Sequence, residues 1–303
     1  MSQVHPMHPD LSMAQLHHFI LVADLKSFHA AAEQAFRTQP AISLSVKELE
    51  RRLGEPLFEK NRKVELTPYG ERCLPLARAL VDHYQQVSGE MLRLANCEEG
   101  AVSIAAVPSV ASRLLPGILA EFARNHPEIR LTVKDGSARE VQGMVSRREA
   151  DFGICSLWED DPSLSFTPLL RDSIGVVCRG DHRLAGLGRA LVWNDLQGER
   201  LIENGTTRLL DNPQAQAAIA ESHFAVSNMI SLIAMLEAGL GITTLPRLAF
   251  PGDNESLVFL TLDEPAVERC IGILTPRDRS LTPAAASLLQ TTRDQLVSAT
   301  AAI

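Results

Sequence analysis

About sixty residues near the amino end constrain this chain more than any other stretch, because they combine three closely spaced helix starts with a short hairpin. Ser12 and Gln15 form a capping box, and the apolar residues that follow at helical spacing predict a first helix over residues 13–24. A second helix begins at Ser27, where alanines on one face allow close packing against neighbours. Two helices therefore precede residue 37.

A third helix begins at Thr38, a good N-cap, with Pro40 in the first turn, where its missing N–H costs nothing. Its apolar residues fall at steps of four, three and four, so one stripe packs inward. These residues are Ile42, Val46, Leu49 and Leu53. The opposite stripe, which carries Gln39, Ser43, Lys47 and Arg51, is free to face a partner.

Gly54 ends the third helix, and residues 57–66 predict a short hairpin with a basic tip. Thr67 and Pro68 cap a fourth helix, whose apolar residues recur every three or four positions. They are Leu76, Leu80, Tyr84, Val87, Met91 and Leu94. Such a long stripe without a neighbouring partner in the sequence indicates a helix that dimerises as a coiled coil.

The order helix, short helix, turn, helix and basic hairpin is that of a winged helix-turn-helix, whose second motif helix enters the major groove of DNA. A generic helical bundle is the alternative, because each feature also serves packing. Residues 37–63 hold seven basic and four acidic side chains, whereas the whole chain has a net charge of −8. A local basic patch fits DNA, although a mixed-charge run also fits a solvated helix face.

A gapless series of core, cap and surface positions in this stretch follows a known pattern. The positions are Leu16, Phe19, Val22, Ala23, Ser27, Phe28, Ala31, Ala32, Gln39 to Ser43, Leu49, Glu50, Leu53, Gly54, Leu57, Phe58, Leu66, Thr67 and Gly70. This series closely resembles the amino-terminal signature of LysR-type transcriptional regulators. The resemblance implies a sequence-specific transcription regulator that binds double-stranded DNA.

The resemblance places DNA contacts at the start of the third helix and in the hairpin. Gln can pair bidentately with adenine, Ser can donate to a phosphate or a base edge, and Arg fits a phosphate or a narrow minor groove. The candidate DNA-binding residues are Thr38, Gln39, Pro40, Ser43, Leu44, Ser45, Lys47, Arg62 and Lys63.

Four positions depart from the family pattern: His29, Ala35, and the pair Leu44 and Ser45, where the family usually has Arg and Gln. We expect Leu44 to replace a phosphate or guanine contact with an apolar contact to a thymine methyl group.

From Ala101 onward, short apolar runs alternate with helical stretches. Strands are predicted at residues 101–107, 129–133 and 151–154, with helices at about 114–126 and 138–147. Alternation of strand and helix predicts an α/β fold with a parallel sheet covered by helices on both faces.

This part also resembles the effector-binding domain of the same family. The matching residues are Leu114, Leu115, Pro116, Phe122, Pro127, Asp151 to Ile154, Glu237 to Ile242, Leu245 and Pro246. The resemblance implies two Rossmann-like lobes, shaped like periplasmic solute-binding proteins and joined by two crossing strands. We expect a DNA-binding domain at 1–68, a linker helix at 69–97 and an effector domain at 101–303. Lobe one would comprise about 101–168 and 270–303, and lobe two about 169–269.

Family analogy puts a small-molecule effector between the lobes, in agreement with the rule that open α/β sheets bind ligands beyond the carboxyl ends of their strands. Ser109 and the adjacent amides suit a carboxylate or another anion. The candidate effector-binding residues are Ser109, Val110, Ser137, Asn204, Thr206, Ser227 and Asn228. Ordinary capping of helices and turns is the alternative role for these polar side chains.

An enzyme and a solute-binding protein are the rival classes. The sequence holds no complete dinucleotide fingerprint, P-loop, nucleophile elbow or zinc-protease motif, so we expect no catalytic residues. Five scattered cysteines without a Cys-x-x-Cys pair predict no metal site, no disulfide framework and a reducing compartment. No signal peptide or run of about 18 apolar residues is present, which predicts a cytoplasmic protein without a membrane span and disfavours the solute-binding protein.

We therefore expect a regulator without a cofactor. A homodimer would pair through the linker helices, and dimers would form a tetramer, as is usual in the family. Two-fold pairing predicts an imperfect inverted repeat in the operator. Effector binding would bias lobe closure and so change DNA bending and contact with RNA polymerase.

Overall fold

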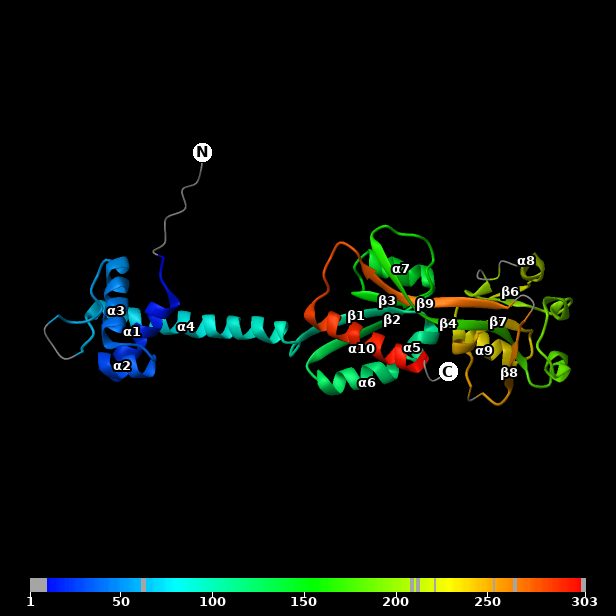
Figure 1. Ribbon diagram of the computed structural model, residues 1–303, viewed down its shortest axis with the longest axis horizontal. Helices are drawn as coiled ribbons and strands as arrows, with labels where there is room; N and C mark the ends of the chain where they lie inside the picture. Colours follow the sequence, from blue (N-terminus) through cyan, green and yellow to red (C-terminus); the bar gives the residue numbers. More distant parts are fainter. Residues whose placement is uncertain are drawn as a thin grey trace, which may run out of the picture. The chain divides into compact units, whose positions relative to one another are not determined.

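The computed structural model describes residues 10–60, 64–207, 210, 213–220, 222–252, 254–263 and 266–300. The chain forms two compact units, Met1–Arg93 and Leu94–Ile303 (Figure 1). Each unit has its own buried core.

The first unit contains α1 (Met13–Leu25), α2 (Phe28–Gln34), α3 (Gln39–Leu53) and most of α4 (Pro68–Ala95). The predicted starts are confirmed, because Ser27 and Thr38 are the N-caps of α2 and α3 and Gly54 ends α3 in the left-handed conformation. The inward stripe of α3 is also confirmed, since Ile42, Val46 and Leu49 are buried.

The hairpin between α3 and α4 is anchored by an antiparallel bridge between Phe58 and Leu66. Thr67 donates its hydroxyl to the carbonyl of Pro56 (2.7 Å) and accepts from the N–H of Gly70 (2.9 Å). A Cβ at Gly70 would lie 2.2 Å from the carbonyl oxygen of Leu57, so only glycine fits this close approach.

The second unit is built on one main sheet, which in the described residues has seven strands in the order β2-β1-β3-β9-β4-β7, with β8 also paired to β4. Their bounds are β1 Gly100–Ala106, β2 Ile129–Asp135, β3 Phe152–Cys155, β4 Leu164–Arg179, β7 Thr243–Pro246, β8 Leu257–Thr261 and β9 Val267–Pro276. The α/β class is confirmed, but the sheet is mixed and not simply parallel as expected. Among the described strands of this sheet, β1, β2 and β3 pair in parallel, whereas β9 is antiparallel to both β3 and β4.

Helices cover both faces of this sheet, as predicted. Figure 1 shows α7 (Ala138–Ser146) on one side of β1 to β3, and α6 (Leu115–Asn125) and α10 (Pro283–Thr300) on the other. A separate short helix, α5 (Pro108–Arg113), precedes α6, so the chain after β1 makes two helices where one was predicted.

Two long strands connect one hydrophobic core of the second unit with two others. β4 and β9 pair along most of their length, with an irregularity between Pro168 and Leu170. One core surrounds β1 to β3, while the far half of β4 belongs to the other cores. The second lobe also contains β5 (Ile202–Glu203), β6 (Phe224–Ala225), α8 (Pro213–Ala220), α9 (Met229–Glu237) and the 3-10 turns η1 (Arg183–Leu187), η2 (Trp193–Leu196) and η4 (Arg247–Ala249).

All five cysteines are free thiols. Burial raises the pKa of the Cys155 thiol to about 12 and that of Cys178 to about 11, which keeps both protonated and inert. Among the described residues, no helix is long and apolar enough to cross a membrane, and no group of three or more metal-ligating side chains gathers.

Candidate functional site

The amino-terminal end of α3 presents its side chains to solvent. Residues 36–41 are all exposed, and they include the predicted contacts Thr38, Gln39 and Pro40. Leu44 is 70% exposed one turn further on. Ser43 is half-buried and Lys47 is exposed, so this face of α3 matches the stripe predicted to face a partner.

Ser45 differs from these neighbours because its hydroxyl is already engaged. Its Oγ lies 2.7 Å from Nδ1 of His18 on α1. Partial burial lowers the pKa of His18, and the nearby His17 and Arg37 lower it further, so the imidazole is neutral at pH 7. The contact fixes α3 against α1 and leaves fewer hydrogen-bonding positions of Ser45 for DNA. Its role in DNA binding stays a prediction.

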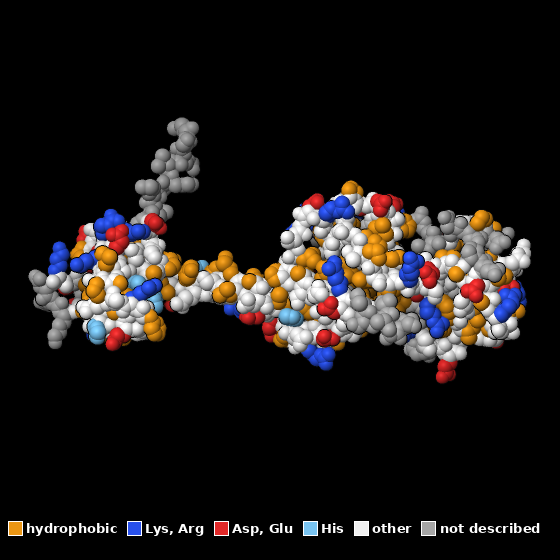
Figure 2. Space-filling model, in the orientation of Figure 1, with side chains coloured by type: hydrophobic (Ala, Val, Ile, Leu, Met, Phe, Trp, Pro, Cys, Tyr) orange, Lys and Arg blue, Asp and Glu red, His pale blue; other side chains and the backbone are white. Residues whose placement is uncertain are grey.

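The basic charge near α3 is partly neutralised within the unit. Glu48 accepts hydrogen bonds from Nε of Arg51 (2.8 Å) and Nε of Arg52 (3.1 Å), which lower the pKa of Glu48 to about 2. Within the described residues, Arg37 and Lys47 make no ion pair. These two cations are therefore available for phosphate groups. Figure 2 shows Lys and Arg side chains on the face of this unit in view.

Arg62 and Lys63 lie outside the described residues, so their role at the hairpin tip stays a prediction.

The predicted dimerisation stripe of α4 is exposed in the single chain. Leu76, Tyr84 and Met91 are 71%, 53% and 66% exposed. Ala77 and Val81 on the same helix are instead buried in the core of the first unit. The helix thus has one face for its own unit and an apolar face that the chain itself leaves open, visible as hydrophobic side chains along α4 in Figure 2.

In the second unit, the predicted effector residues follow the carboxyl ends of strands. β1 and β2 are parallel and in register, which puts Ser109 and Ser137 at one edge of the sheet. β5 and β6 are also parallel, which puts Asn204 and Asn228 at one edge of the second lobe. η4, directly after β7, packs against α5, directly after β1. The two lobes therefore meet at the carboxyl ends of their strands.

A buried ion pair lies at this junction. Nε and Nη2 of Arg269 donate to Oδ2 of Asp172 (3.0 and 2.7 Å), and Nη2 also donates to the hydroxyl of Ser109 (2.7 Å). The other oxygen of Asp172 accepts from the backbone N–H of Leu248 in η4 (3.0 Å). Burial lowers the pKa of Arg269, and Asp172 opposes this shift, so the guanidinium stays charged.

Sequence reasoning missed Asp172 and Arg269. The available signal was a pair of adjacent, oppositely charged residues in each strand segment, Arg171 with Asp172 and Glu268 with Arg269, close to both predicted lobe boundaries. Buried charges of this kind are almost always paired.

Most of the predicted effector residues have structural roles. Ser109 is 4% exposed, and Val110 is fully buried in the core of lobe one, where its N–H bonds to the carbonyl of Val107 and its carbonyl accepts from the N–H of Leu114. Ser137 caps α7 by accepting from the N–H of Glu140, and Asn228 caps α9. Their ligand contacts stay predictions.

Asn204 is likewise engaged, since Nδ2 donates to Oγ1 of Thr243 and to the carbonyl of Thr244. Thr206 donates its hydroxyl to Oδ1 of Asn204 (2.6 Å), whereas Ser227 is exposed. Ordinary capping of helices and turns therefore accounts for some of the candidate effector-binding residues, whereas Ser227 lies exposed at the surface.

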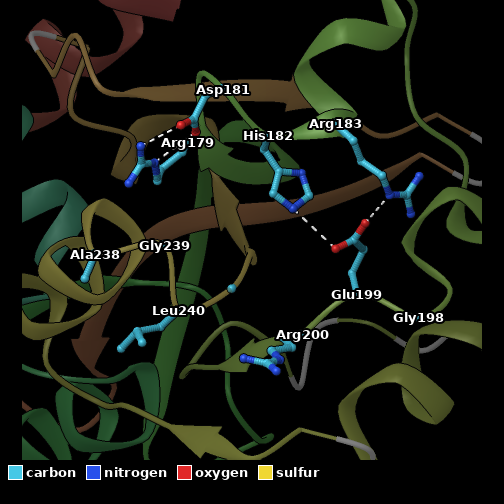
Figure 3. Close-up of a pocket in the computed structure, with 11 residues that line it drawn as sticks. Arg179, Asp181, His182, Arg183, Gly198, Glu199, Arg200, Ala238, Gly239 and Leu240 are labelled. Atoms are coloured by element: carbon cyan, nitrogen blue, oxygen red, sulfur yellow. Dashed lines mark hydrogen bonds and ion pairs between the residues drawn. The ribbon is translucent and has the colours of Figure 1, made fainter.

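A separate polar hollow of about 790 Å³ lies within lobe two (Figure 3). Its charged residues largely neutralise one another, since Arg179 pairs with Asp181 and both His182 and Arg183 pair with Glu199. None of the predicted effector residues lines it. We therefore take the lobe junction, and not this hollow, as the candidate effector site.

Sequence comparison decides the family. Residues 13–71 match the family described as bacterial regulatory helix-turn-helix protein, lysR family, and residues 95–297 match the LysR substrate binding domain. This chain belongs to the LysR family. The resemblance seen in the sequence is confirmed: this LysR-type protein is a DNA-binding transcription regulator with an effector-binding domain.

Individual relatives agree with this assignment. The LysR-type chain is 31% identical to the uncharacterized HTH-type transcriptional regulator YbhD of Escherichia coli K12 over 274 residues, which cover 88% of this chain and 86% of YbhD. Its fold is similar to that of a full-length OxyR variant from Pseudomonas aeruginosa, with a TM-score of 0.75, 20% identity, and coverage of 94% and 99% of the two chains. It is also similar to CbnR complexed with its target DNA, with a TM-score of 0.67, 19% identity and the same coverage.

Proposed function

We propose that this regulator binds its operator through the amino-terminal half of α3 and responds to a small anion held at the junction of the two lobes. The face formed by the exposed Gln39 and Pro40 and the half-buried Ser43, backed by the buried stripe of α3, carries the proposal. A helix fixed by its buried side presents its exposed side chains in a defined geometry, which base recognition needs.

The α3 residues divide into base and phosphate contacts. Gln39 pairs with adenine through its amide, and Ser43 donates to a base edge or a phosphate. Lys47 and Arg37 supply phosphate contacts, because both cations lack an intrachain ion pair in the described residues. Thr38, Leu44 and Ser45, with Arg62 and Lys63 of the hairpin, complete the interface. The similarity in fold to CbnR, a protein solved with its target DNA, supports this arrangement.

The effector is proposed to be a carboxylate or a similar oxyanion. The guanidinium of Arg269, held by Asp172, lies at the junction and donates to Ser109, and Ser137 brings a further hydroxyl from a strand end of lobe one. Asn204, Thr206, Ser227 and Asn228 face it from lobe two, and the backbone of Val110 lies beside Ser109. An effector controls the regulator only if it binds one arrangement of the lobes more tightly than the other.

Assembly is proposed to follow the α4 stripe. Two copies pair through α4, dimers form a tetramer, and the operator is an imperfect inverted repeat. The protein works in the cytoplasm, contacts RNA polymerase and carries out no catalysis.

Selection from a random pool of duplex DNA with the full-length protein tests the proposal. Enrichment of an inverted repeat with half-sites about one helical turn apart is the expected result. If many rounds leave the pool without a shared sequence, sequence-specific binding is wrong. The selected operator then serves for a screen of small carboxylates that shift its affinity.

A further inference from the structure

Phe36 occupies a backbone position that favours glycine. The end of α2 is closed by two hydrogen bonds, from the N–H of Phe36 to the carbonyl of Glu33 (3.1 Å) and from the N–H of Arg37 to the carbonyl of Ala32 (2.9 Å). This pair of bonds defines a Schellman motif, in which the residue after the cap is left-handed. Phe36 has a φ of 52°, where its Cβ crowds the backbone.

Packing does not account for the aromatic ring either. Phe36 is 92% exposed, and it is not part of the hydrophobic core of its unit. The core phenylalanines behave differently, since Phe19 and Phe28 each pack edge-on against Phe58 at centroid distances of 5.6 and 5.7 Å. A left-handed backbone at a non-glycine residue and an apolar ring left in water both disfavour the folded unit, so the presence of Phe36 indicates a role outside the chain.

The position of Phe36 relates this ring to DNA. It begins the exposed run that continues through Thr38 and Gln39 into the first turn of α3. In helix-turn-helix proteins the amino-terminal residues of the second motif helix contact the base edges of the major groove. The apolar group that a base pair displays there is the thymine methyl, which Phe is able to contact.

We propose that the ring of Phe36 contacts a thymine methyl group of the operator, next to the base pairs bound by Gln39. The proposal rests on the DNA-binding function proposed above and adds a sequence determinant to it. Leu44, 70% exposed on the next turn of α3, contacts a different thymine, so the two side chains select thymines at separate positions.

The test uses two variants of the full-length protein and a set of modified operators. Phe36→Asn removes the ring and places a residue that tolerates the left-handed conformation, whereas Phe36→Tyr keeps the ring. Each thymine of the selected operator is replaced in turn by deoxyuridine, which deletes only the methyl group. Affinities are measured by gel shift or fluorescence anisotropy at several salt concentrations, and melting temperatures are recorded by circular dichroism.

The proposal predicts that the wild-type protein loses about five- to tenfold in affinity at one thymine per half-site. Phe36→Asn binds the unmodified operator about tenfold more weakly, and its affinity no longer changes when deoxyuridine replaces that thymine. Phe36→Tyr behaves like the wild type. The salt dependence of Phe36→Asn stays unchanged, because no cation is lost. Its melting temperature is equal or higher, which shows that the lost affinity does not come from misfolding. Leu44→Ala still loses affinity when deoxyuridine replaces the thymine that Phe36 contacts.

Two results would overturn the proposal and leave operator binding intact. One is that Phe36→Asn binds as tightly as the wild type. The other is that it binds more weakly but keeps the full response to every deoxyuridine, which would place the ring on the sugar–phosphate backbone. If the wild-type protein itself shows no selective binding, the proposed function fails before this question arises.

Discussion

Arg269 on β9 and Asp172 on β4 lie directly opposite each other in the register of the two crossing strands and form an ion pair with side chains only 6% and 5% exposed. Ser109 of lobe one joins the pair through the guanidinium, and Leu248 joins it through the carboxylate. The network thus connects the strands that cross between the lobes with the segments that meet at their junction. Any movement of the lobes has to preserve or break these bonds.

Removing one partner of this pair is predicted to destabilise the second unit severely. Asp172→Ala leaves an uncompensated buried guanidinium, which costs about 3–5 kcal/mol. Urea unfolding followed by the fluorescence of Trp158 and Trp193, both in this unit, measures the change in the free energy of unfolding. The double variant Asp172→Ala, Arg269→Met should recover much of the loss. A loss below about 1 kcal/mol in the single variant would contradict the burial of the pair.

The first unit is predicted to lose stability as the pH falls through the titration of His18. The folded-state pKa lies below the ordinary value of 6.5, so the unfolded chain binds the proton more tightly. The contribution of His18 is complete above pH 6.5 and is lost as the pH falls from there toward the lower folded pKa. His18→Gln, which keeps a partner for Ser45, should flatten this dependence. Thermal melting of the helices at several pH values measures this dependence. If the melting temperature changes equally with pH in the wild type and in His18→Gln, the prediction is wrong.

Gly70→Ala is predicted to destabilise the first unit by about 1–3 kcal/mol, because the new Cβ would collide with the carbonyl of Leu57. Gly89→Ala on the same helix is the matched control. Its Cβ meets only the flexible end of Arg93 at 3.4 Å, so the better helix propensity of alanine should stabilise α4 by up to about 1 kcal/mol. If Gly70→Ala melts at a higher temperature than Gly89→Ala, the carbonyl of Leu57 does not lie tightly against residue 70.

A charge in the α4 stripe is predicted to break the dimer. Tyr84→Glu puts a carboxylate into the proposed apolar interface, whereas Gln85→Glu adds the same charge one residue away from the stripe. Light scattering after size-exclusion chromatography should show a smaller particle for the first variant alone. Equal masses for both variants and the wild type would place the dimer contact elsewhere.

Local signals made the first unit predictable from sequence. The capping residues Ser27 and Thr38 and the terminal Gly54 act within one helical turn, so the chain shows them directly. The contact between Ser45 and His18 was not predictable, because 27 residues separate the partners and nothing in either helix pattern specifies the other. The short helix α5 was not predicted, although Pro108 in its first turn is a local start signal, and Pro116 in the first turn of α6 separates the two helices.

The sheet of the second unit was only partly predictable for the same reason. Strands β1 to β3 follow from apolar runs between helices, and their parallel order follows from the alternation with helices. The antiparallel pairing of β4 and β9 joins residues such as Asp172 and Arg269, which are 97 positions apart. Their chemistry becomes visible only when the strands are paired, and with it the network that holds Ser109.

Operator binding by Gln39 and Ser43 is tested most directly by gel shift with the selected operator across a salt series. The account predicts sequence-selective binding that weakens steadily with salt and falls by about tenfold or more in Gln39→Ala and in Ser43→Ala. Gln86→Ala on α4, which also removes an exposed glutamine, should bind like the wild type. Selective binding that survives both α3 substitutions unchanged would show that this face of α3 does not contact the operator.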